Sequence, residues 1–145
     1  MKDKRGFELA KHASEFSDYK KNGIHIGAVI VRKNKVLGIG WNQNKSHPIQ
    51  YEYNKYRFND TEREYDRTTQ TNSIHAEISA IKDALRRNPS EDLSKCDIYI
   101  YRTNLGMCCP CEACAKVLKE NNIKKIHYTN NGYVNERRVY ENNIK

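Results

Sequence analysis

Two pairs of potential metal-binding or proton-transferring residues lie far apart in this sequence, each at the predicted start of a helix. His75 and Glu77 occur in the segment SIHAEISAI, and Cys111 and Cys114 occur in the segment CCPCEACAKVL. Thiolate sulfur and imidazole nitrogen are ligands that zinc favours. A fold in which these residues share one metal must therefore bring the two helix starts together.

Hydrophobic periodicity predicts that helices and strands alternate around one sheet. The two β-branched runs IHIGAVIV and KVLGIGW, separated by RKNK, predict an antiparallel hairpin. The expected elements are, in order, a helix (6–19), two hairpin strands (24–31 and 35–41), a helix from about 74 that ends at RRNPS, a strand (97–101), a helix (110–118), a strand (123–129) and a tail from 133 that is expected to form a last helix.

The length and composition indicate one globular domain over 1–145, with a single hydrophobic core. No apolar run approaches the roughly 20 residues that span a bilayer, so we expect no membrane partner. The first residues lack the apolar core of a signal peptide. Four of the five cysteines crowd into 108–114, which argues against a disulfide framework and favours the reducing cytoplasm.

The formal net charge is +8, and the excess of Lys and Arg lies toward the two ends of the chain. Basic ends of this kind can attract the phosphate of a nucleotide or of a nucleic-acid strand. They can equally form a solvated surface that keeps the protein apart from its copies. The charge by itself leaves both interpretations open.

The spacing within each motif predicts how the side chains could share a metal. Cys111 and Cys114 are three residues apart, so they lie on one face of a helix. His75 can supply a third ligand, but on a regular helix it would point about 200° away from Glu77. Both can reach one metal only if His75 lies where the chain bends into the helix. Glu77 then lies beside the metal without binding it, free to take a proton from a bound water.

A simpler interpretation is a zinc site that only stabilises the fold. A Cys-x-x-Cys pair alone is often a redox pair or half of a structural zinc site. A structural site would need a fourth protein ligand, which Cys108 or Cys109 could in principle provide. A purely structural site, however, has no need of Glu77.

The combination of the two motifs resembles the zinc-dependent cytidine deaminase-like superfamily, whose signature is H-x-E followed by P-C-x-x-C. The resemblance implies an α/β fold, a three-layer α-β-α sandwich with a central mixed sheet. It also implies Zn²⁺ held by His75, Cys111 and Cys114, with Glu77 as the general acid and base. The implied reaction is hydrolytic deamination, in which zinc lowers the pKa of the attacking water. By analogy we expect a homo-oligomer.

The resemblance also implies contacts with the substrate. Asn42 in GIGWNQN matches a strand-end asparagine of the family, and Ala76 is the middle residue of the His-Ala-Glu motif. Arg102 and Thr103 follow the third predicted strand and should lie close to the pocket. Each of these four residues also has an ordinary structural interpretation, which stays open here.

Departures from other branches of the superfamily favour the deoxycytidylate deaminases, including phage-type members. Free-cytidine deaminases usually carry glutamate and arginine where this chain has Asn44 and Ala115. The tRNA adenosine deaminases carry glutamate directly before the proline, where this chain has Cys109. We therefore expect conversion of dCMP to dUMP. The alternatives are a free cytidine or deoxycytidine deaminase and a deaminase that acts on single-stranded DNA or RNA.

The polar segment 43–72 resembles the long insertion of the deoxycytidylate group and is a candidate substrate lid. Its side chains could stack on a base or meet a phosphate, or they could belong to a surface helix that packs on the core. The segment is electrically neutral, which favours a small nucleotide over a nucleic-acid strand. The residues concerned are Lys45, His47, Tyr51, Tyr53, Lys55, Tyr56, Arg57, Phe58 and Tyr65.

Overall fold

A computed structural model describes residues 1–19, 23–54, 73–106, 108, 110–130 and 132–138. The elements in chain order are α1 (Asp3–Ser14), β1 (Ile26–Arg32), β2 (Lys35–Trp41), α2 (Pro48–Asn54), α3 (Ala76–Arg87), the 3-10 turn η3 (Leu93–Lys95), β3 (Asp97–Arg102), the 3-10 turn η4 (Thr103–Leu105), α4 (Glu112–Glu120), β4 (Lys125–Asn130) and β5 (Tyr133–Arg138).

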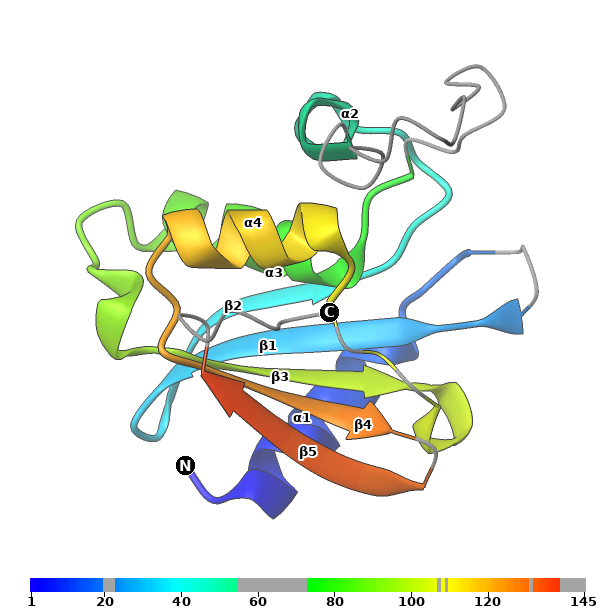
Figure 1. Cartoon of the computed structure of the whole chain (residues 1–145), viewed down its shortest axis with the longest axis horizontal. Helices are drawn as coiled ribbons and strands as arrows, with labels where there is room; N and C mark the ends of the chain where they lie inside the picture. Colours follow the sequence, from blue (N-terminus) through cyan, green and yellow to red (C-terminus); the bar gives the residue numbers. More distant parts are fainter. Residues whose placement is uncertain (20–22, 55–72, 107, 109, 131, 139–145) are drawn as a thin grey trace.

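The strands form one five-stranded sheet in the order β2-β1-β3-β4-β5 (Figure 1). β1 pairs antiparallel with both β2 and β3, and β5 pairs antiparallel with β4. β3 and β4 are parallel, and α4 forms the crossover that parallel neighbours require. The sheet is therefore mixed, as predicted.

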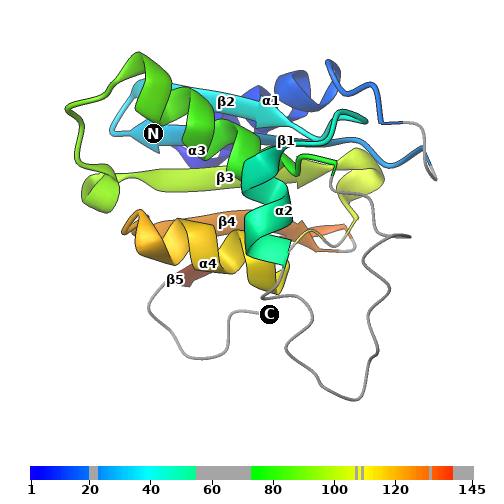
Figure 2. The ribbon, with the colours of Figure 1, turned by 90° about the horizontal axis from the view of Figure 1, so that it is seen from above.

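Alternate residues of the central strands face two separate cores. In β1, Ala28 and Ile30 belong to the core under α3 and α4, whereas Val29 and Val31 belong to the core against α1. This period of two is the ordinary geometry of a strand that is buried on both faces. Figures 1 and 2 show α1 on one face of the sheet and α3 and α4 on the other. The predicted three-layer α-β-α architecture is confirmed.

The topology brings the starts of α3 and α4 to the same end of the sheet. At that end Gly27 of β1 pairs with Trp41 of β2 and with Tyr101 of β3, so β1 begins where β2 and β3 finish. The chain leaves β2 toward α3 and leaves β3 toward α4. The two motifs that lie far apart in the sequence consequently meet here.

Gly40 allows α3 to start close against β2. A Cβ atom on Gly40 would lie 2.3 Å from the backbone nitrogen of Ala80 and 2.4 Å from the carbonyl oxygen of Ala76. Both neighbours are backbone atoms of α3, so a side chain here could be accommodated only by moving the helix. The glycine thus sets the distance between β2 and the first turn of α3.

The last helix predicted for the tail from 133 is wrong, because residues 133–138 form the strand β5. Gly132 has φ +93°, a conformation that glycine adopts readily, and the turn pairs Asn130 directly with Tyr133. The edge of β4 would otherwise present a row of unpaired backbone groups, and β5 satisfies them.

The first helix ends at Ser14, earlier than predicted. Beyond it, the Ser17 hydroxyl lies 2.7 Å from the carbonyl oxygen of Asn42 and 2.6 Å from its Oδ1 atom. The tertiary contact between Ser17 and Asn42 therefore lies in a segment that the periodicity predicted to be helical. Within the described ranges, no helix is long and apolar enough to cross a membrane.

Candidate metal centre

His75 lies at the boundary position that its predicted role requires. It is the N-cap of α3, with an extended backbone (φ −81°, ψ 157°), and its carbonyl accepts the first helical hydrogen bond, from Ser79 N–H at 3.0 Å. Its own N–H donates to Oε1 of Gln50 at 2.9 Å. The bend at His75 separates its side-chain direction from that of the helical residues that follow.

The start of α4 is built from the cysteine motif itself. Cys111 is the N-cap, with φ −65° and ψ 169°, and its Sγ accepts the N–H of Cys114 at 3.5 Å. The carbonyl of Cys111 accepts the N–H of Ala115 at 2.8 Å. The same sulfur therefore caps the helix and faces the second thiol one turn on.

The three predicted ligands meet in one cluster. Nδ1 of His75 lies 3.6 Å from Sγ of Cys111 and 3.3 Å from Sγ of Cys114, and all three atoms lie within 4.8 Å of one another. A tetrahedral zinc with ordinary bond lengths would hold a sulfur and a nitrogen about 3.6 Å apart. The donor types and their spacing thus fit a single zinc ion.

Cys108 does not join this cluster in the described part of the chain. Its buried thiol donates toward the carbonyl of Ile100 at 3.3 Å and lies 3.1 Å from Oγ1 of Thr129. Burial raises the pKa of Cys108 to about 12, so the thiol stays protonated. Cys109, the other candidate fourth ligand, lies outside the described residues. Among the described residues the group has three members, the number that a catalytic zinc site uses when it keeps one position for water.

Glu77 is buried beside the cluster, with 6% of its surface exposed. Among the described residues, the ligand-atom group does not include its carboxylate. Burial raises the pKa of Glu77, whereas the nearby His75 lowers it by a smaller amount. A carboxyl group with a raised pKa holds a proton more readily than an ordinary carboxylate, which suits a group that accepts a proton and returns it.

The two thiols have opposite tendencies to ionise. The pKa of Cys111 is lowered well below its usual value because the Cys114 thiol and His75 hydrogen bond to its sulfur. The pKa of Cys114 is raised, mainly by burial. Without metal, Cys111 is therefore the thiol of the pair that ionises more readily. A zinc ion would favour the thiolate form of both.

A model of the family described as "Cytidine and deoxycytidylate deaminase zinc-binding region" matches residues 1–130. The chain belongs to this family. A zinc-binding deaminase domain is thus established, and His75, Cys111 and Cys114 could form its zinc site.

Solved structures of deaminases share the fold. A cytidine deaminase from Burkholderia pseudomallei has 21% identity and a TM-score of 0.68, over 96% of this chain and 94% of that chain. The dCMP deaminase from the cyanophage S-TIM5 has 20% identity in its apo form, with a TM-score of 0.59 over 90% of this chain and 86% of that chain. Its complex with dCMP and dUMP has 23% identity and a TM-score of 0.57, over 87% and 81% of the two chains. A search of curated proteins found no match.

Two residues predicted to bind substrate in this deaminase tie strand ends together. Oδ1 of Asn42 accepts the N–H of Ile26 at 2.9 Å, and Nδ2 donates to the carbonyl of Ile24 at 2.9 Å. Oγ1 of Thr103 accepts the N–H of His25 at 3.0 Å and donates to its carbonyl at 2.9 Å. These bonds fix the rim of the sheet at the end where α3 and α4 begin. Substrate contact by either residue stays a prediction.

The other two predicted substrate residues also lie at this end of the molecule. Ala76 is the first residue of α3 and is 1% exposed. The backbone N–H of Arg102 donates to Oγ1 of Thr129 at 3.2 Å, and its side chain packs against Gly106. Their contacts with substrate stay predictions as well.

The first part of the insertion forms the helix α2, which contacts α4. Figure 2 shows α2 lying across α3 and α4, over the ends where those helices begin. Tyr53 packs on the core and its hydroxyl hydrogen bonds to Glu120, whereas Tyr51 is 52% exposed.

The predicted contacts Lys55, Tyr56, Arg57, Phe58 and Tyr65 lie outside the described residues. The sequence did not predict a role for Gln50, because nothing in a polar segment distinguishes a glutamine that will be buried.

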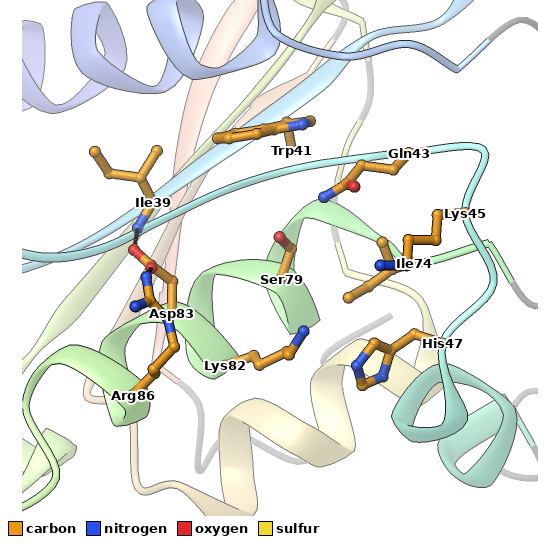
Figure 3. Close-up of a pocket in the computed structure, with 10 residues that line it drawn as sticks. All are labelled: Ile39, Trp41, Gln43, Lys45, His47, Ile74, Ser79, Lys82, Asp83 and Arg86. Carbon is orange, nitrogen blue, oxygen red and sulfur yellow. Dashed lines mark hydrogen bonds and ion pairs between the residues drawn. The ribbon is translucent and has the colours of Figure 1, made fainter.

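Lys45 and His47 line a hollow on the side of α3 that faces β2 (Figure 3). This cavity has a volume of about 170 Å³, and Lys82 and Ser79 of α3 point toward it. Burial lowers the pKa of His47, and Lys82 and Lys45 lower it further. Its lining residues are Ile39, Trp41, Gln43, Lys45, His47, Ile74, Ser79, Lys82, Asp83 and Arg86, none of which is a predicted zinc ligand.

Proposed function

We propose that the protein is a zinc-dependent hydrolytic deaminase of cytosine nucleotides that converts dCMP and water to dUMP and ammonia. The observation that carries the proposal is the buried Glu77 beside the cluster of His75, Cys111 and Cys114, in a chain of this family. A site that served only to stabilise the fold would have no use for an adjacent carboxyl with a raised pKa.

In this proposal His75, Cys111 and Cys114 hold the zinc. When bound, zinc makes a water molecule acidic enough to attack the base near neutral pH. Glu77 accepts one proton of the attacking water at its carboxylate and delivers it to the ring nitrogen. It then accepts the second proton of the same water and passes it to the amino group, which leaves as ammonia. The burial of Glu77 keeps bulk water from competing for that proton.

Three observations support dCMP as the substrate. The S-TIM5 enzyme, which shares the fold, is a dCMP deaminase and was solved with dCMP and dUMP. The chain has Ala115 after the second cysteine, and the insertion 43–72 is long, as in the deoxycytidylate group. We propose that Asn42, Ala76 and the pair Arg102 and Thr103 line the substrate pocket.

We further propose that the enzyme works as a homo-oligomer in the cytoplasm. The four described cysteines are free thiols, which suits a reducing compartment. Light scattering coupled to size-exclusion chromatography tests the assembly. A protein that elutes as a monomer at micromolar concentration would contradict that part of the proposal.

The deciding experiment is a deamination assay read by mass spectrometry. The zinc-loaded protein is incubated with cytidine, deoxycytidine, CMP, dCMP, dCTP, and single-stranded DNA and RNA oligomers. We expect dCMP to be converted with the highest kcat/KM, and Glu77→Gln to reduce the rate by about 10² to 10⁴-fold while zinc remains bound. Higher kcat/KM for the free nucleosides, or conversion only within oligomers, would overturn the assignment of substrate. Full activity of Glu77→Gln would overturn the mechanism.

A further inference from the structure

Gln50 is a fully buried polar residue that makes a direct contact with a predicted zinc ligand. Its exposed fraction is 0%, although it lies in the polar insertion. Its Oε1 accepts the backbone N–H of His75 at 2.9 Å, and its Nε2 donates to Oδ1 of the buried Asn54 at 2.7 Å. The amide is thus held at both ends, and Asn54 determines which end faces His75.

The start of α3 needs this contact because its own sequence cannot provide it. In a capping box, a glutamate or glutamine at the third helical position accepts the N–H of the N-cap residue. In α3 the N-cap is His75 and the third helical position is Ile78, which has no acceptor in its side chain. Gln50 supplies from another helix the acceptor that a capping box supplies locally.

The position of Gln50 is fixed relative to both halves of the metal cluster. The N–H of Ile74 donates to the carbonyl of Lys45 at 3.0 Å, and an isolated bridge joins Ser46 to Ser73, so the base of the insertion is closed next to His75. On its other side α2 contacts α4, which carries the cysteines. Movement of α2 would therefore be transmitted to His75.

We propose that Gln50 is a positioning residue for His75, with Asn54 orienting its amide. By holding the His75 backbone at the helix boundary, Gln50 keeps Nδ1 directed at the two thiols. The insertion thereby contributes to the zinc site itself, in addition to its predicted role in covering the substrate. The inference rests on the proposed zinc ligands but not on the proposed substrate. Outer partners that orient metal ligands typically account for 10 to 100-fold in metal affinity.

The test measures zinc affinity by competition with a chromophoric chelator, together with the visible absorption of the Co²⁺-substituted protein. Gln50→Met keeps the approximate size of the side chain but removes the acceptor, and Gln50→Glu keeps an acceptor oxygen for the His75 N–H. Tyr51→Ala, at an exposed position of the same helix, is the matched control. We expect Gln50→Met to weaken zinc binding about 10-fold or more and to change the cobalt spectrum. Gln50→Glu should recover part of the zinc affinity lost in Gln50→Met, because it keeps an acceptor for the His75 N–H but loses the bond to Asn54. Tyr51→Ala should match the wild type.

Unchanged zinc affinity and an unchanged cobalt spectrum in Gln50→Met would overturn the inference, even if the metal-free protein is less stable. That result would make Gln50 a fold-stabilising residue only. If Gln50→Met does not fold, Asn54→Ala decides, because it releases the amide without removing it. Weaker zinc binding by Asn54→Ala supports the inference, and zinc affinity equal to that of the wild type overturns it. Zinc binding is measured without substrate, so a protein that binds zinc normally but deaminates nothing would refute the proposed function alone.

Discussion

The two helix starts that carry the metal cluster are held in different ways. At the start of α4, Cys111 caps the helix with its own sulfur, which accepts the N–H of Cys114 three residues on. At the start of α3, His75 makes no side-chain capping bond with the described residues, and its N–H is bound by Gln50 from 25 residues away. One start is organised locally and the other by tertiary contact.

This difference has a physical cause. A cysteine that caps its helix and binds metal serves both purposes with one atom, because the helix dipole and the metal both favour the thiolate. Imidazole at the N-cap instead has to face away from the helix to reach the thiols, so the backbone needs another partner. We expect substitution of the metal ligand at the start of α4 to reduce both helix stability and metal binding. Substitution of the ligand at the start of α3 should reduce metal binding with less effect on helix stability.

The largest expected effect comes from removing a ligand at each start. Cys111→Ala and His75→Ala should each weaken zinc binding by more than the 10 to 100-fold typical of outer partners. Cys111→Ala also removes a cap, so the metal-free protein should lose about 0.5 to 2 kcal/mol of unfolding free energy. His75→Ala should cost less, because its N–H still donates to Gln50.

The measurements are zinc content after gel filtration and urea unfolding in the presence of a chelator. Cys114→Ala is the matched control, because it removes a ligand but leaves the Cys111 sulfur as a cap. Equal destabilisation of the metal-free protein by His75→Ala and Cys111→Ala would contradict the proposed difference between the two starts.

The second prediction concerns the reactivity of the thiols in zinc-free protein. Burial raises the pKa of Cys96 to about 11 and that of Cys108 to about 12, whereas the pKa of Cys111 is lowered. At pH 8 roughly one Cys96 thiol in a thousand is ionised, so iodoacetamide should modify Cys111 at least about 100-fold faster. From pH 7 to pH 9 the Cys96 rate should rise about 100-fold, whereas the Cys111 rate should rise less steeply because its pKa is lowered.

Peptide mapping by mass spectrometry over a time course measures each rate, and unfolded protein provides the reference in which these differences disappear. Added zinc should slow the modification of Cys111 and leave that of Cys96 unchanged. Modification of Cys96 before Cys111 in folded protein would contradict the ionisation pattern of the cluster.

The third prediction tests how closely α3 must approach the sheet. Gly40→Ala places a Cβ atom 2.3 Å from the backbone nitrogen of Ala80, and overpacking of this kind costs about 1 to 3 kcal/mol. The start of α3 should also shift, which would weaken zinc binding. Lys35→Ala, at an exposed position of β2, is the control and should change the unfolding free energy by less than about 0.5 kcal/mol. If Gly40→Ala has the same unfolding free energy as the wild type, α3 can move away from β2 at no cost, which would contradict the prediction.

The smallest expected effect is at the contact between α2 and α4. Tyr53→Phe removes the hydroxyl that hydrogen bonds to Glu120 at an exposed site, so the loss of unfolding free energy should stay below about 1 kcal/mol. Zinc affinity should change less than about 2-fold. A double-mutant cycle with Glu120→Gln measures the coupling. If Tyr53→Phe lowered zinc affinity as much as Gln50→Met does, α2 would act on the site mainly through its contact with α4.

Local pattern was sufficient for much of this molecule. The two β-branched runs at 24–31 and 35–41 predicted an antiparallel hairpin, and β1 and β2 form it. Pattern failed at the tail, where β5 forms because β4 needs a partner for its edge. It also gave no warning that Asn42 and Thr103 would tie strand ends, because a polar side chain in a loop has many available partners.

The sequence by itself predicted the helix α4, although two residues too early, and the residues that could serve as metal donors. Cys111 and Cys114 lie within one helical turn, so their juxtaposition needs nothing beyond the geometry of a helix. Only the tertiary structure decided how His75 is held, because its partner Gln50 comes from the insertion and depends on the closure of that loop and the packing of α2. Contacts over short separations follow from local geometry, whereas contacts between distant segments form only when the whole core has been assembled.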